Sequence, residues 1–96
     1  MDNNLHEFIE LLTKAINVAN VKLERLQKED SNKGLIEMAE LTVKNLQDWR
    51  NIAVAGKLPR PSHGAGLGLS KHIGDWCNDE LYELALDLDE YYQTKM

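Results

Sequence analysis

A chain of 96 residues has room for one small folded unit with a single core and one or two surface sites. Hydrophobic residues make up 43% of the chain and charged residues 28%, a balance typical of folded rather than disordered proteins. The net charge of −5 disfavours general binding to nucleic acids, because their phosphate backbones repel an acidic surface.

The single cysteine, Cys77, excludes a disulfide within the chain and favours a reducing compartment. The first residues show no basic segment followed by an apolar run, so we expect no secretory signal. No apolar stretch approaches the roughly 20 residues that a membrane-spanning helix needs. The sequence therefore predicts a soluble, cytoplasmic protein that does not bind membranes.

Apolar residues at helical spacing predict a first helix from about Asn4 to Glu29. Its apolar face comprises Leu5, Phe8, Ile9, Leu12, Ile16, Ala19, Leu23 and Leu26. Leu11, Val18 and Val21 widen this face, and one neighbouring helix is too narrow to cover all of it. We therefore expect two neighbouring helices, or a second copy of the chain in a homodimer.

A polar turn at residues 29–34 precedes a second predicted helix from about Leu35 to Ala55. Its main apolar stripe comprises Leu35, Ala39, Thr42, Leu46, Trp49 and Ala53. Gly56 is well placed to end this helix, because glycine readily adopts the left-handed backbone conformation that closes helices. Pro59 and Pro61 then predict an extended loop over residues 56–66.

Two shorter helices follow the loop. The first is predicted over residues 68–77, and Asn78 or Asp79 then caps a helix that runs to about Gln93. Its predicted buried side comprises Leu81, Leu84, Ala85, Leu88, Tyr91 and Tyr92. The sequence thus predicts one all-α domain over residues 1–96, a small antiparallel helical bundle with a Pro/Gly-rich loop between its second and third helices.

The glycine-rich stretch at residues 64–71 superficially suggests a phosphate-binding loop. A dinucleotide fingerprint would need glycine where Leu69 or Lys71 stands, and a P-loop would need glycine in place of Ser70. A simpler anion site remains open, since backbone NH groups at a helix start are unpaired. Its side chains are Arg60, Ser62, His63, Lys71 and His72. Alternatively, the glycines only let the loop pass close over Trp49 or Trp76.

Metal binding and catalysis are not indicated. The spacing of His63, His72 and Cys77 matches no compact zinc motif, and His6 with Glu10 supplies at most half of a site. Cys77 and His72 lie five residues apart, about 140° around a helix, so they do not form a nucleophile and base pair. We therefore predict no cofactor, no metal and no enzymatic activity.

Charge gathers at the end of the chain, where residues 75–96 contain seven acidic residues and Lys95 as the single base. Asp79, Glu83, Asp87 and Glu90 recur at helical spacing and should form one ridge, although such like-charge neighbours slightly destabilise a helix. We predict that this ridge binds a basic partner protein, with Tyr91 or Tyr92 as an apolar anchor. The alternative is a solvated face that only aids solubility.

Three functions are compatible with these patterns. The first is a small interaction protein, of the immunity or inhibitor type, that binds and neutralises a basic partner. The second is an accessory or sensor domain that binds an anion through the basic loop over residues 56–72. The third is a homodimeric bundle with a structural role.

Overall fold

The computed structural model describes residues 3–29, 32–59 and 67–95. Within these ranges the chain forms four helices and no strand: α1 (Asn3–Lys28), α2 (Lys33–Val54), α3 (Leu69–Gly74) and α4 (Glu80–Lys95). The predicted all-α bundle of two long and two shorter helices is confirmed. None of these helices is both long and apolar enough to cross a membrane.

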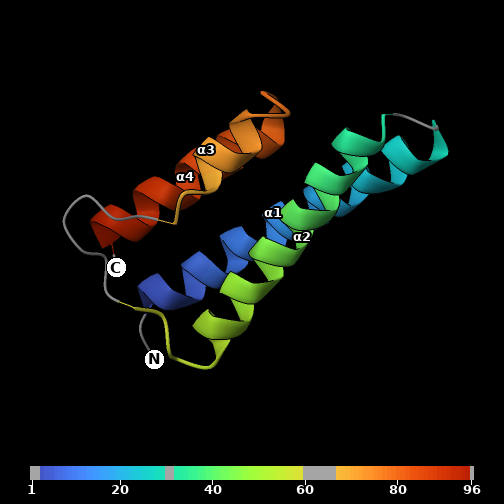
Figure 1. Ribbon diagram of the computed structural model, residues 1–96. Helices are drawn as coiled ribbons and strands as arrows, with labels where there is room; N and C mark the ends of the chain where they lie inside the picture. The colour runs from blue at the N-terminus through green and yellow to red at the C-terminus, as the bar shows by residue number, and fades with distance from the viewer. Residues whose placement is uncertain (1–2, 30–31, 60–66, 96) are drawn as a thin grey trace.

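The helices form two antiparallel hairpins that lie against each other (Figure 1). α1 and α2 make the long hairpin, α4 packs along α1, and α3 packs on α4. The direction of α4 is set at its two ends, where the Asn4 side chain donates to the carbonyl of Lys95 at 3.1 Å and Lys22 pairs with Asp79. The first turn of α1 and the last turn of α4 therefore lie at the same end of a molecule 43 Å long.

The core lies along the contacts of α1 with α2 and α4 and of α4 with α3. Phe8, Leu12, Leu46, Ile73, Leu81 and Leu88 are its largest fully buried apolar side chains. Phe8 lies next to two rings of α4, with ring centroids 6.2 Å from Tyr91 and 6.1 Å from Tyr92. Trp49 of α2 also lies next to Tyr92, with ring centroids 6.4 Å apart. This aromatic cluster fixes the last turns of α4 against the first turns of α1.

The helix ends follow the expected chemistry. Gly56 has a φ of +72°. Its backbone NH donates to the carbonyl of Ala53, and the NH of Lys57 donates to the carbonyl of Ile52, so α2 closes at this glycine as predicted. Asn32 caps the start of α2, accepting from the Gly34 backbone NH at 2.7 Å. The third helix is shorter than predicted and ends at Gly74, because the chain turns back there and Gly74 lies directly against the Tyr82 ring.

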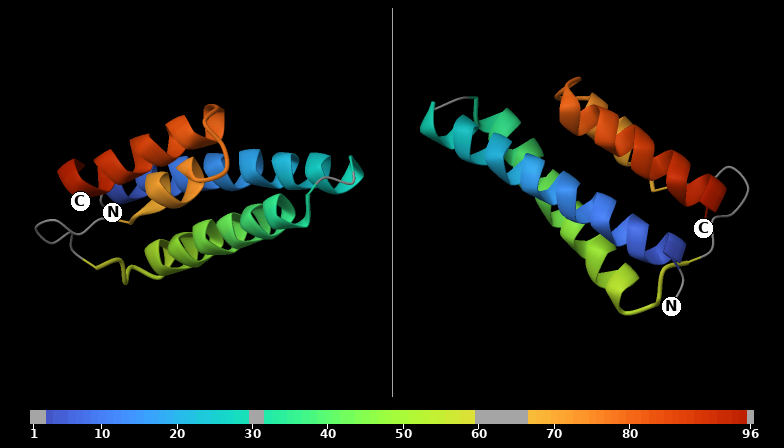
Figure 2. Two further views of the ribbon diagram at one scale, coloured as in Figure 1. Left: turned by 45° about the horizontal axis from the view of Figure 1, so that its top comes forward. Right: turned by 180° about the vertical axis from the view of Figure 1, so that it is seen from behind.

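Burial along α1 stops earlier than the sequence pattern predicts. The predicted apolar face runs to Leu26, yet the last buried residue of α1 is Ala19. In α2, likewise, Leu35 is exposed and burial begins at Ala39. The reason is the length of α4, which begins at Glu80 opposite Lys22 and leaves the end of the α1–α2 hairpin uncovered (Figure 2).

Candidate functional site

The predicted acidic ridge of α4 comprises four carboxylates, and one of them, Asp79, is held by a hydrogen bond and an ion pair. Glu83, Asp87 and Glu90 are exposed. Asp79 precedes the helix and caps it, accepting a hydrogen bond from the Leu81 backbone NH at 3.1 Å. Its carboxylate also pairs with Lys22 of α1. Asp79 therefore positions the start of α4, although its side chain is still 48% exposed, and the rest of the ridge continues from Glu83.

The environment of Asp79 makes the fold sensitive to acid. Partial burial raises the pKa of its carboxyl group, but the hydrogen bonds from Lys22 and Leu81 and the charge of Lys22 lower it by more. Since the pKa is lower in the folded than in the unfolded chain, ionised Asp79 stabilises the fold above about pH 4, and this contribution disappears at lower pH. We expect wild type to melt higher than Asp79→Asn at pH 6, with the difference shrinking below about pH 4.

Asp79→Asn is a matched variant, because asparagine still caps a helix but carries no charge. Melting followed by circular dichroism between pH 2 and pH 7, at about 50 mM salt, measures the difference. A difference between the two proteins that stays constant over this range would show that the charge of Asp79 does not stabilise the fold.

The two tyrosines of α4 have different roles. Tyr92 is only 4% exposed, and its hydroxyl donates to the carbonyl of Pro59 at 2.5 Å. Burial also raises the pKa of Tyr92. Tyr92 thus ties the segment after α2 to α4 and lies in the core, so it is not accessible as an anchor for a partner. This leaves Tyr91, which is half-buried at the seam between α1 and α4.

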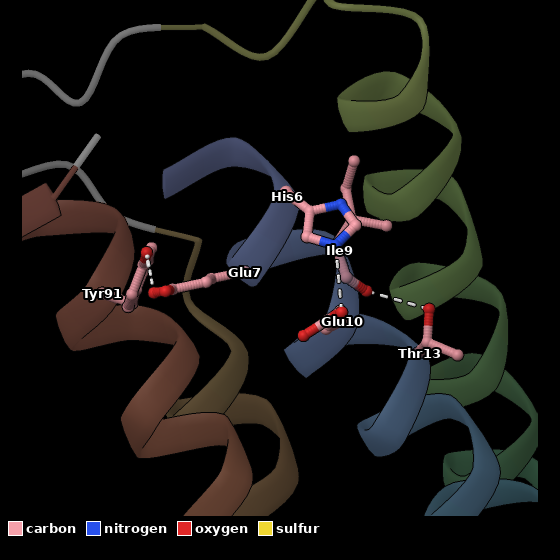
Figure 3. Close-up of polar contacts among 6 residues, drawn as sticks. All are labelled: His6, Glu7, Ile9, Glu10, Thr13 and Tyr91. Carbon is pink, nitrogen blue, oxygen red and sulfur yellow. Dashed lines mark hydrogen bonds and ion pairs between the residues drawn. The ribbon is translucent and has the colours of Figure 1, made fainter. Parts of the chain in front are cut away.

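Tyr91 is held from two directions. Its ring stacks on Phe8 with an interplanar angle of 22°. Its hydroxyl donates to the Glu7 carboxylate at 2.8 Å, and Figure 3 shows the two side chains meeting across the gap between α4 and α1. A tyrosine fixed in this way loses little further freedom when a partner packs on it.

The packing of α1 against α4 joins acidic side chains from both helices into one surface. We call this surface the acidic face, and it comprises Glu7 and Glu10 of α1, Glu83, Asp87 and Glu90 of α4, and Leu11 and Tyr91 between them. Two open hollows flank Tyr91. One, of about 300 Å³, is lined by Leu11, Asp87, Glu90, Tyr91, Thr94 and Lys95. The other, of about 420 Å³, is lined by Glu7, Glu10, Leu11, Lys14 and Tyr91.

The charges of the acidic face are largely uncompensated. In the described part of the chain, the carboxylates of Glu83, Asp87 and Glu90 form no hydrogen bond or ion pair. On α1, Glu10 lies 3.0 Å from the exposed His6 ring. Lys14 and Lys95 border the hollows but pair with no carboxylate among the described residues. A basic surface would therefore find free acceptors here.

The charge and apolar pattern of the last helix did not indicate that Glu7, Glu10 or Leu11 belongs to this site. The antiparallel arrangement of the bundle was predicted, and it implies that the end of one helix lies beside the start of another. The pattern of one helix at a time does not reveal which helices are neighbours or in what register. The pairing of Glu7 with Tyr91 therefore became visible only with the packing of α1 on α4.

The predicted anion site is described only in part. Arg60, Ser62 and His63 lie outside the described residues. Lys71 is exposed on α3, and His72 is half-buried, with an Nε2 that has no hydrogen-bond partner in the described ranges. Two backbone NH groups at the start of α3 are already used, because Leu69 and Ser70 donate to the carboxylate of Asp89 at 3.2 and 2.8 Å. An internal carboxylate thus takes two of the NH groups considered for an external anion.

The remaining candidate chemistry is weak. Burial raises the pKa of the Cys77 thiol, and the negative charge of Asp79 raises it further. The thiol is therefore a poor nucleophile at neutral pH. Among the residues that the structure describes, no three His, Cys, Asp or Glu side chains lie close enough together to hold a metal ion.

Searches against protein-family models, curated proteins and solved structures find no match for this chain.

Proposed function

We propose that this chain is a small protein-interaction module that binds a basic partner protein through the acidic face of α1 and α4. Within this class, it fits a protein of the immunity or inhibitor type, which acts by covering a basic surface of its target. The observation that supports the proposal is the joining of carboxylates from two helices around one fixed, half-buried tyrosine.

The distribution of charge supports recognition more than stability. Neighbouring carboxylates on one helix face repel each other and cost a few tenths of a kcal/mol per pair. Asp87 and Glu90 of α4 line one hollow beside Tyr91, and Glu7 and Glu10 of α1 line the other, so both helices bring carboxylates to this surface. A complementary basic surface would relieve this repulsion, steer the encounter and reject acidic competitors.

Tyr91 and Leu11 add an apolar centre to the charged surface. Binding energy in protein interfaces is usually concentrated in a few aromatic or arginine side chains, which are surrounded by polar contacts that exclude water. Tyr91 lies between the two hollows, so an arginine or lysine of the partner can lay its aliphatic stem on the ring and reach the carboxylates on either side.

The test is capture of the partner from the native source, using immobilised wild-type protein and two variants as baits. We expect wild type to retain a basic protein that elutes at about 0.5 M salt, where charges are screened over a few ångströms. The double variant Asp87→Lys, Glu90→Lys should fail to retain it.

Glu40→Lys, Asp48→Lys is the matched control. It makes the same change in net charge at two exposed positions of α2, away from the acidic face, and it should retain the partner. If both variants lose the protein equally, net charge alone explains the retention and the acidic face is not the site.

A further inference from the structure

The end of the α1–α2 hairpin has no core of its own. We define the hairpin end as residues 20–29 of the first arm and 32–38 of the second. None of these described residues is buried. Six of them are large and apolar: Val21 and Leu35 are exposed, whereas Leu23, Leu26, Ile36 and Met38 are half-buried, Leu23 against the edge of the core. The hairpin end projects past the turn between α3 and α4 in all views, so no further helix covers it (Figures 1 and 2).

Its apolar surface continues into two grooves beside that turn. One, of about 510 Å³, lies between α1 and the start of α4 and is lined by Asn17, Val18, Val21, Lys22, Arg25, Asp79 and Glu80. The other, of about 560 Å³, is lined by Leu35, Met38, Leu41 and Trp76, with Asn32, Gly34, Glu37 and Asp75 around them. Val21, Leu35 and Leu41 are 55%, 37% and 45% exposed, which is unusual for such side chains when they gather at one end of a small domain.

The charge of this region differs from that of the rest of the molecule. Residues 20–38 contain four basic and four acidic residues, so their net charge is zero, whereas the whole chain carries −5. A strongly basic partner is attracted elsewhere, to the acidic face. Two copies of the hairpin end do not repel each other, and bases such as Arg25 and Lys28 can meet acids such as Glu37 of the other copy.

We propose that a second copy of this chain covers the hairpin end, so that two hairpin ends pack together across a two-fold axis. A two-fold contact requires a surface that is complementary to itself, and an apolar surface with interspersed charges of both signs meets this requirement. The proposal is independent of the acidic face, whose centre at Glu7, Glu10 and Tyr91 lies at the opposite end of α1.

Sedimentation equilibrium of the purified protein, without any partner, tests this proposal. We expect wild type to approach twice the chain mass of 11.0 kDa as its concentration rises. Leu35→Glu and Val21→Glu place a charge in the proposed contact and should keep the protein at the monomer mass. Both side chains are already exposed to solvent, so the helical circular dichroism should be unchanged.

Leu86→Glu and Val54→Glu are the matched controls. These side chains are similarly exposed, at 42% and 59%, but they lie on α4 and at the other end of α2. Both variants should dimerise like wild type. A wild-type protein that stays monomeric at every concentration overturns the proposal. So does a dimer that survives Leu35→Glu and Val21→Glu, or one that Leu86→Glu disrupts equally. Capture of the basic partner in the bait experiment does not affect these outcomes.

Discussion

Reversing the charge of Asp87 and Glu90 to lysine is expected to slow association with the basic partner about 10- to 1,000-fold at low ionic strength. The reason is that opposite charges accelerate encounter over several ångströms, and these two carboxylates flank the tyrosine on which we expect the partner to dock. Stopped-flow mixing or surface plasmon resonance at about 20 mM salt measures the association rate directly.

The salt dependence and one control separate steering from other effects. Near 0.5 M salt the Debye length falls to roughly 4–5 Å, so the rates of wild type and variant should converge. Glu40→Lys, Asp48→Lys should slow association much less, although the net charge changes equally. An unchanged association rate for Asp87→Lys, Glu90→Lys at low salt would show that the acidic face is only a solvated surface.

Replacing Phe8 with alanine is expected to lower the free energy of unfolding by about 3–5 kcal/mol. Phe8 is fully buried and lies against both Tyr91 and Tyr92, so its removal leaves a cavity between the first turns of α1 and the last turns of α4. The total stability of a domain of this size is about 5–15 kcal/mol, so the loss is a large fraction of it. Urea denaturation followed by circular dichroism measures the change.

The same substitution also removes the ring on which Tyr91 stacks. We therefore expect a weaker near-ultraviolet circular dichroism signal from the tyrosines under conditions where the helices remain folded. Leu86→Ala is the control, because that side chain is exposed and its loss should change stability by less than about 0.5 kcal/mol. A loss below about 1 kcal/mol for Phe8→Ala would contradict the role assigned to this ring.

The helices and their caps were predictable because they depend on local chemistry. Apolar spacing placed all four helices, Gly56 supplied the left-handed residue that ends α2, and Asp79 capped α4 as one of two named candidates. These features are determined by residues within a few positions of one another along the chain. The carboxylates of Glu83, Asp87 and Glu90 were likewise found exposed, as their spacing on one helix predicted.

Features that depend on contacts between distant segments were not predictable. The pairing of Lys22 with Asp79 and of Glu7 with Tyr91 depends on the register of α1 against α4. The pattern of α1 alone assigns Leu23 and Leu26 to the same face as Leu12, yet only tertiary packing decides how far along that face burial extends. The capping of α3 by Asp89 similarly joins residues about twenty positions apart.

The order in which the helices pack has a consequence for how the molecule opens. α2 packs on α1, α1 on α4, and α4 on α3, so the main packing partner of α3 is α4, although Trp76 just after α3 donates a hydrogen bond to Thr42 of α2. Undocking α3 breaks its hydrogen bonds to Asp89 while α1, α2 and α4 keep most of their contacts. Detaching α4, in contrast, removes the main support of α3 and separates the two halves of the acidic face. Local unfolding therefore costs less free energy at α3 than at α4, and the acidic face survives the first kind of opening but not the second.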